Sequence, residues 1–236
     1  MNRSDGMTFA DKVIQFNKQL DFNGTLPAGI RIMNPFKENP QVIGIMEQFY
    51  KKFYDDNNPR HLILGINPGR FGGGVTGIPF TDSKRLKSVC KIDYDGKETH
   101  EPSSVFVYEM IAAFGGAEYF YKNFYIHSIC PLGFTSIKED GKEINYNYYD
   151  SPALTAAVYD FMIENIWKQI AMGINAETCF CFGNGKNEKF LRKLNEKEHF
   201  FKNIVALEHP RFIMQYKLRS KDVYIKKYID AFNSVL

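Results

Sequence analysis

The sequence predicts an α/β protein with a four-stranded parallel sheet covered by helices on both faces. The chain has 236 residues, 44% of them hydrophobic, which is enough for one sizeable α/β core. Four short apolar runs rich in β-branched and aromatic residues are bounded by turn residues, as in buried strands. Helical patterns lie between these runs. Strands that alternate with helices form right-handed crossovers, which produce a parallel sheet.

The four predicted strands are His61–Ile66, Phe124–Ile129, Thr178–Phe182 and Asn203–Leu207. Each run is too short for a helix. In open parallel sheets the ligand crevice lies outside the C-terminal ends of the strands. The residues of interest are therefore those that follow each run, which are Asn67 onward, Cys130-Pro131, Gly183 to Gly185 and His209-Pro210.

Helices are expected both before and after the first predicted strand in the sequence. Thr8 can cap a helix that carries Phe9, Val13, Phe16 and Leu20, and Gln41–Tyr54 has apolar residues at helical spacing. Later helical patterns cover Ser104–Phe114, Pro152–Met172, Lys186–Leu194 and Asp222–Phe232. No internal repeat or linker is visible. We therefore expect one domain over residues 1–236, in which residues 1–58 form a helical segment that packs on the sheet.

Cysteine usage and the N-terminus exclude several protein classes. The four cysteines form no C-x-x-C pair, so we predict no metal site, no iron–sulfur cluster and no disulfide framework. The first residues contain no long apolar run, so neither a signal peptide nor a membrane span is predicted. We expect a cytoplasmic protein with reduced thiols.

The charge is unevenly distributed along the chain. The net charge is only +3, but residues 181–236 hold twelve Lys and Arg against six Asp and Glu. A basic C-terminal part suits a polyanionic partner. The alternative is a solvated helix face rich in lysine.

A glycine-rich segment follows the first predicted strand. Gly72 to Gly77 fit the spacing G-x-G-x-x-G, but dinucleotide-binding glycines open a helix directly after the strand. Here Asn67-Pro68-Gly69 intervene, and Pro79 closes a stretch without a helical apolar period. The ribose-binding acid expected about 20 residues later would be Asp93 or Asp95, in a polar turn. No G-K-[ST] follows as in a P-loop, so we predict neither site.

Asn67 indicates different chemistry for this loop. It follows the first predicted strand, and its amide has both donors and an acceptor, so it can hold a water for attack. The glycines would let backbone N–H groups approach a flat ligand closely. Phe80 ends the loop with a ring suited to stacking on a base. Alternatively, Asn67 is a turn residue and Phe80 belongs to the core.

Three motifs carry a resemblance to a known family. Gly65-Ile66-Asn67-Pro68-Gly69, followed by Thr76-Gly77-Ile78-Pro79-Phe80, resembles the first motif of the uracil-DNA glycosylase superfamily, most closely in its single-strand-selective monofunctional branch. His127-Ser128-Ile129-Cys130-Pro131-Leu132 resembles that branch's H-N-x-C-P-L segment. Glu208-His209-Pro210 resembles its second catalytic motif, L-H-P-S-P. The resemblance covers roughly residues 60–235, and three motifs in the family's order are more specific than one.

The resemblance implies a three-layer α/β/α sandwich around a central four-stranded parallel sheet. It also implies a monomeric, monofunctional DNA glycosylase of base excision repair. Such an enzyme hydrolyses the N-glycosidic bond of uracil or a related damaged base that has been flipped out of single- or double-stranded DNA. Enzymes of this kind need no metal and no cofactor.

The resemblance also assigns roles to individual residues. Asn67 would position the attacking water, and His209 would hydrogen-bond the departing base and stabilise the negative charge on its O2. Backbone N–H groups around Ile66 and Gly69 would line the base pocket. Phe80 would stack on the flipped base.

Ser128 departs from the family pattern, in which an asparagine reads the base. An Asn amide can donate and accept in a bidentate match to uracil, whereas a hydroxyl is shorter and has one rotating donor. We expect weaker discrimination, with hypoxanthine, xanthine or an oxidised pyrimidine among the possible substrates. Alternatively, a nearby Asn or a water supplies the missing contact.

The segment after His209-Pro210 also departs from the family, where a loop inserts a wedge into the duplex. Arg211 with Phe212 or Ile213 could place a cation beside an apolar plug. The expected phosphate contacts are Arg70, Lys217, Arg219 and Lys221. For the lysines a solvated surface is the alternative.

Two rival functions remain open from sequence. One is a nucleic-acid-binding protein of the same fold that has lost catalysis, and the other is a glycosidase that acts on small nucleosides. The presence of Asn67 and His209 argues against the first, and the basic C-terminal part argues against the second. The tyrosine-rich segment Asn145–Asp150 has no assigned role beyond a loop or lid.

Overall fold

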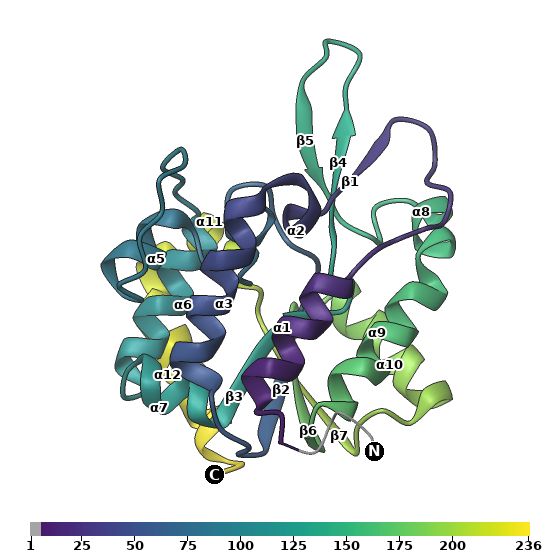
Figure 1. Cartoon of the computed structure of the whole chain (residues 1–236). Helices are drawn as coiled ribbons and strands as arrows, with labels where there is room; N and C mark the ends of the chain where they lie inside the picture. Colours follow the sequence, from purple (N-terminus) through teal and green to yellow (C-terminus); the bar gives the residue numbers. More distant parts are fainter. Residues whose placement is uncertain (1–5) are drawn as a thin grey trace.

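A four-stranded parallel sheet lies at the centre of the computed structural model, which describes residues 6–236 (Figure 1). Its strands are β2 (Arg60–Gly65), β3 (Phe124–Ser128), β6 (Ile174–Phe182) and β7 (Asn203–Leu207), in the order β3-β2-β6-β7. All three pairings are parallel, so the C-terminal ends of the strands meet at one edge. The predicted fold class is confirmed, and each predicted strand overlaps an observed one.

Helices cover both faces of this sheet. Phe9 of α1 (Phe9–Gln19) packs against Tyr125, whereas Phe232 of α12 (Lys221–Asn233) packs against Phe124, with ring centroids 5.2 and 4.7 Å apart. Neighbouring residues of a strand face opposite sides, so these two helices lie on opposite faces. Figure 1 likewise shows α6 (Pro102–Ala113) and α12 on one side, and α9 (Tyr159–Ala171) and α10 (Lys186–Glu198) on the other.

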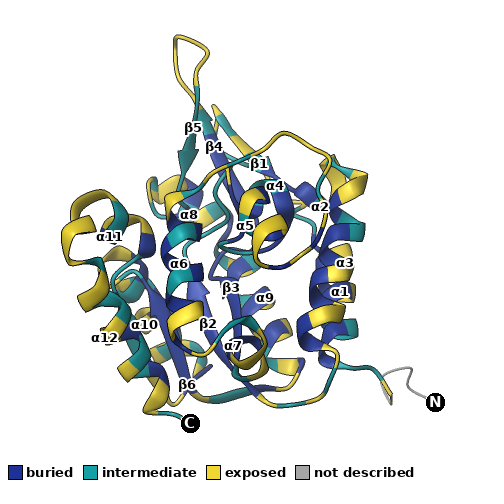
Figure 2. Ribbon diagram, turned by 90° about the vertical axis from the view of Figure 1, so that its left-hand side faces the viewer, coloured by how far each residue is buried: buried dark blue, intermediate teal, exposed yellow. Residues whose placement is uncertain are grey.

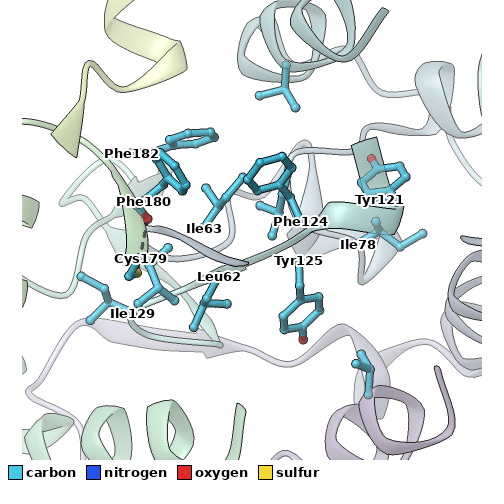
Figure 3. Close-up of a cluster of buried hydrophobic side chains, with 14 of the residues drawn as sticks. Leu62, Ile63, Ile78, Tyr121, Phe124, Tyr125, Ile129, Cys179, Phe180 and Phe182 are labelled. Atoms are coloured by element: carbon cyan, nitrogen blue, oxygen red, sulfur yellow. Dashed lines mark hydrogen bonds between the residues drawn. The ribbon is translucent and has the colours of Figure 1, made fainter. Parts of the chain in front are cut away.

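The strands are buried because both of their faces are covered. Every residue of β2 and β3 is buried, which agrees with the apolar residues Leu62 to Leu64 and Phe124 to Ile126 at their centres (Figure 2). Leu62 and Ile63 belong to one hydrophobic cluster that extends from Phe9 to Phe232, and Figure 3 shows its centre. No helix within residues 6–236 is long and apolar enough to cross a membrane.

A second, antiparallel sheet was not predicted from the sequence. It consists of β1 (Ile30–Met33), β4 (Gly133–Ile137) and β5 (Glu143–Tyr146), in the order β1-β4-β5. The β4–β5 hairpin extends away from the body of the molecule, and its tip is exposed (Figures 1 and 2). Residues 1–58 are therefore not purely helical, because they contribute β1. Residues 1–5 of that segment lie outside the described residues.

The helices differ from the prediction in several places, and some short helices, among them those over 83–88, 117–123 and 210–216, were not predicted at all. Gly73–Thr76 form a single helical turn, α4, in a stretch where no helix was expected, and Gly77 ends it with a φ of +72° that favours glycine. Pro152–Met172 divides at Val158 into α8 and α9. The remaining elements are α2 (Pro35–Glu38), α3 (Pro40–Tyr54), α5 (Ser83–Ser88), α7 (Ala117–Asn123), α8 (Pro152–Ala157), α11 (Pro210–Tyr216) and the 3₁₀ turn η1 (Leu218–Ser220).

Candidate active site

A cavity of about 250 Å³ opens where the C-terminal ends of the parallel strands meet. It lies at the crevice position expected for such a sheet. The cavity brings together eight of the residues that the sequence nominated, which are Ile66, Asn67, Gly69, Phe80, Ser128, His209, Arg211 and Phe212. These residues come from three strand ends and the glycine loop, so only the fold brings them into contact with one space.

Asn67 is fixed by the backbone at the end of β5 and just after it. Its Nδ2 donates to the carbonyl of Tyr146 at 3.2 Å, and its Oδ1 accepts from the N–H of Tyr148 at 3.0 Å. An amide has two N–H donors and two acceptor lone pairs, so one of each remains for a ligand. The side chain is thus oriented at the cavity wall with hydrogen-bonding capacity left over.

His209 follows β7 and is the N-cap of α11. Its Nδ1 accepts from the backbone N–H of Arg211 at 3.1 Å, so the proton of the neutral ring lies on Nε2. Burial, together with the nearby Arg211 charge, lowers the pKa of His209 to about 4. The half-buried imidazole is therefore neutral at physiological pH.

The chain before His209 is anchored to α12. The carboxylate of Glu208 pairs with Lys227 at 2.8 Å, and the hydroxyl of Tyr228 donates to the Glu208 carbonyl. These contacts tie the end of β7 to the helix that covers the sheet. They fix the position from which the imidazole meets the cavity.

Phe80 holds a backbone conformation that is uncommon for a bulky residue, with a φ of +52°. The hydroxyl of Ser104 donates to its carbonyl at 2.7 Å and supports this conformation. The Phe80 ring centroid lies 5.7 Å from that of His209. Gly65 makes room for it, because a Cβ at that position would lie 2.9 Å from the ring. The ring is therefore a positioned wall of the cavity.

Ser128 is the last residue of β3 and lines the cavity, although its side chain is largely buried. His127, the neighbouring residue, has a different environment. It lies between the rings of Phe16 and Tyr125, and burial lowers its pKa to about 4. His127 thus belongs to the core, and Ser128 is the residue of this motif that meets the cavity.

Several residues of the cavity were missed from the sequence. Asn145, Asn147 and Tyr149 belong to the tyrosine-rich segment, which begins as strand β5 rather than as a loop. Asn145 also accepts from the backbone N–H of Arg70 at 3.0 Å. The Asp140-Gly141 pair between β4 and β5 is a turn signal that could have predicted this hairpin. Glu101, which precedes α6, gave no comparable signal.

The basic residues nominated from the sequence do not all reach the cavity. Arg70 lies in an adjacent groove with its guanidinium 4.4 Å from the ring centroid of Phe71. Lys217 and Arg219 are exposed at the end of α11 and in η1, outside both concavities. The ammonium of Lys221 pairs with Glu109.

Of the two apolar residues nominated after His209-Pro210, only Phe212 is exposed. Ile213 is buried and cannot reach DNA, which corrects one of the two alternatives. Phe212 is 41% exposed at the cavity rim and packs against Tyr216 with ring centroids 5.5 Å apart. Within residues 6–236, no three His, Cys, Asp or Glu side chains are grouped to hold a metal ion.

A comparison with family models shows which protein family this chain belongs to. The model described as uracil DNA glycosylase superfamily matches residues 51–233, most of the chain. The chain belongs to the uracil-DNA glycosylase superfamily. Membership in this superfamily implies a DNA substrate, and the family predicted from the three motifs is confirmed.

A solved structure places the chain within the superfamily. This chain is similar to the crystal structure of wild-type Pedobacter heparinus SMUG2, with 69% sequence identity and a TM-score of 0.95. The similarity covers 97% of this chain and 98% of that one. The predicted resemblance to the single-strand-selective monofunctional branch is thereby confirmed. No protein in a curated set matches.

Proposed function

We propose that this chain is a monofunctional DNA glycosylase that hydrolyses the N-glycosidic bond of uracil or a related base in DNA. The observation that carries the proposal is the convergence of Asn67 and His209 on one cavity from separate strand ends, beside the ring of Phe80. The enzyme acts as a monomer in base excision repair. The abasic site that it leaves is passed to other repair activities.

The leaving base gains negative charge as the C1′–N bond breaks. His209 presents a neutral Nε2–H, because its Nδ1 already accepts from the backbone. This donor is fixed before the reaction and meets the developing charge on O2 of the base. Preorganised donors of this kind contribute on the order of 10²–10³ in rate. The ring of Phe80 stacks on the base and keeps it in the pocket.

Asn67 holds the attacking water. Two of its hydrogen-bonding positions are taken by the backbone at Tyr146 and Tyr148, which aims the amide. Its remaining donor and acceptor bind the water and place its oxygen opposite the breaking bond. Such positioning lowers the barrier because the reactants no longer have to be ordered during the reaction.

Ser128 sets a relaxed base preference. Its single hydroxyl can meet one edge atom of the base, whereas an amide could match two. Asn145 and Asn147 line the same cavity and are candidates for the contact that an asparagine at position 128 would make. We therefore expect uracil to be accepted together with at least one other deaminated base.

DNA approaches along the groove beside the cavity. Arg70 and Arg211 line this groove and would bind phosphates, and the exposed ring of Phe212 would occupy the space left by the flipped nucleotide. Lys217 and Arg219 are exposed on the same C-terminal part and would contact more distant phosphates.

The test is a glycosylase assay on single- and double-stranded oligonucleotides that each carry uracil, hypoxanthine, xanthine or hydroxymethyluracil. The proposal predicts alkali-labile abasic sites with uracil and at least one other base. Cleavage of none of them, with DNA binding retained, would instead support a binding protein without catalysis. Hydrolysis of free deoxyuridine at a rate that exceeds that of the oligonucleotide would support the nucleoside glycosidase.

A further inference from the structure

A second concavity of about 680 Å³ adjoins the base cavity. It contains three cationic side chains, Arg70, Lys142 and Arg211, so it suits the phosphates of a nucleic acid. Five residues line both spaces and therefore mark the boundary between them, namely Glu101, Ser103, Asn145, Arg211 and Gln215.

This boundary is where the sugar of a flipped nucleotide would lie. The deoxyribose of a flipped nucleotide connects its base to its phosphates. With the base in the cavity and the phosphates in the cationic groove, the sugar and its C1′ atom lie at the boundary. Glu101 is the one carboxylate among the described residues that line either space.

The Glu101 side chain is placed by the glycine loop. A Cβ at Gly69 would lie 2.9 Å from its Oε1, and a Cβ at Gly72 would come closer still to Oε2. Its backbone N–H donates to the buried carboxylate of Asp82 at 2.7 Å. The two glycines thus leave the space that the carboxylate fills, and Asp82 anchors the chain behind it.

Structural hydrogen bonds do not occupy all the lone pairs of the Glu101 carboxylate. Glu101 is the N-cap of α6, but its side chain makes no capping hydrogen bond. Within residues 6–236, the one group that hydrogen-bonds its carboxylate is the hydroxyl of Ser104 at 3.3 Å, and that hydroxyl lies closer, at 2.7 Å, to the carbonyl of Phe80. Lone pairs of the carboxylate therefore remain available at the boundary.

Hydrolysis is accelerated by a group that takes the proton of the attacking water. Asn67 cannot serve, because an amide is not basic. His209 cannot serve either, because its Nδ1 accepts from the backbone and its Nε2 carries the proton. A carboxylate beside C1′ has the chemistry that both residues lack.

We propose that Glu101 is a catalytic residue that receives the proton of the attacking water, an inference that rests on the glycosylase function proposed above. The water oxygen forms a bond to C1′ while the C1′–N bond breaks, and the bonding pair leaves with the base. One water proton passes to Glu101. The negative carboxylate also faces the cationic sugar of the transition state and stabilises it. Solvent later protonates the released base.

The charges around Glu101 make the group suitable for this role. Burial raises its pKa to about 7, nearby Asp82 raises it further, and Ser104 and Arg211 act in the opposite direction. A general base is most effective when its pKa lies near the working pH. The other charged or titratable groups that line the two spaces or lie beside Glu101 are Arg70, Arg85, His100, Lys142, Tyr149, His209 and Tyr216.

The test is the single-turnover rate of uracil release from a single-stranded oligonucleotide between pH 5 and 9. The wild-type rate should fall about tenfold per pH unit below an apparent pKa near 7. Glu101→Gln should lower the rate at pH 8 by about 100-fold or more, abolish this acidic limb and leave oligonucleotide affinity unchanged. Glu98→Gln, an exposed nearby carboxylate, is the matched control and should behave as wild type.

A second variant separates catalysis from structure. Glu101→Ala should regain activity when formate is added, because a small carboxylate can occupy the vacated space. Formate should not stimulate the wild type. The proposal is overturned if Glu101→Gln keeps the wild-type rate or its acidic limb, or if formate fails to rescue Glu101→Ala. A wild-type protein that releases no base from any oligonucleotide would overturn the proposed function itself.

Discussion

Replacing His209 by asparagine separates its role as a helix cap from its proposed role as a hydrogen-bond donor to the base. In the structure His209 caps α11 by accepting from the Arg211 N–H at 3.1 Å, and it lines the cavity, where Nε2–H is the proposed donor to the base. Asparagine is among the best N-cap residues, so His209→Asn keeps the cap but withdraws the donor. His209→Ala removes both and should also destabilise the fold by about 0.5–2 kcal/mol.

The expected loss of rate follows from the missing donor. Removing one preorganised donor to a developing oxyanion lowers the rate on the order of 10²–10³, or roughly 2.7–4 kcal/mol. We expect this loss in single-turnover release of uracil by His209→Asn, with oligonucleotide affinity nearly intact. Thermal unfolding should show that its stability stays within about 1 kcal/mol of the wild type.

The matched control is His199→Asn. His199 is exposed at the end of α10 with a φ of +55°, a conformation that asparagine tolerates well. This variant should keep the wild-type rate. A His209→Asn protein that also keeps its rate within threefold would refute the assignment of His209 as the donor to the leaving base.

Three further predictions concern other residues of the site. Asn67→Ala should lower the single-turnover rate strongly with little change in DNA affinity, and an unchanged rate would contradict the role of Asn67. The variant also removes the hydrogen bonds to Tyr146 and Tyr148, so its free energy of unfolding should be lower by roughly 1–3 kcal/mol. Ser128→Asn should shift competition assays toward uracil over hypoxanthine, and unchanged relative rates would show that Ser128 does not read the base. Glu101→Gln should be more stable than the wild type at pH 8 by at most about 3 kcal/mol. The reason is that folding raises the pKa of the Glu101 carboxyl from 4.5 to about 7, so ionisation of this group opposes folding as the pH increases. No such gain is expected at pH 4, and an equal gain at both pH values would contradict the raised pKa.

The parallel sheet could be predicted because its strands carry a strong local signal. β2 and β3 are buried on both faces, so each carries a run of apolar residues, Leu62 to Leu64 and Phe124 to Ile126, and turn residues follow the strand ends. The residues after the strand ends then had to share one edge of the sheet. Asn67 and His209 could therefore be paired across more than 140 positions of sequence.

The hairpin and Glu101 were harder to predict for different reasons. Each residue of β5 is only partly buried, so Glu143–Tyr146 lacks the apolar signal of a core strand. The role of β5 depends on the hydrogen bond from Asn67 to the Tyr146 carbonyl, and only the folded chain brings these residues near each other. Glu101 is a single charged residue before a helix, a common surface pattern, and its significance comes from the two glycines that face it.

The most direct test of the account is whether the wild-type protein releases free uracil from a single-stranded oligonucleotide. The account predicts free uracil and an intact strand that breaks only after treatment with alkali, as expected for a monofunctional enzyme. It also predicts that Asn67→Ala and His209→Asn release uracil far more slowly. Binding of the oligonucleotide without release of uracil, or strand cleavage without alkali, would contradict the account.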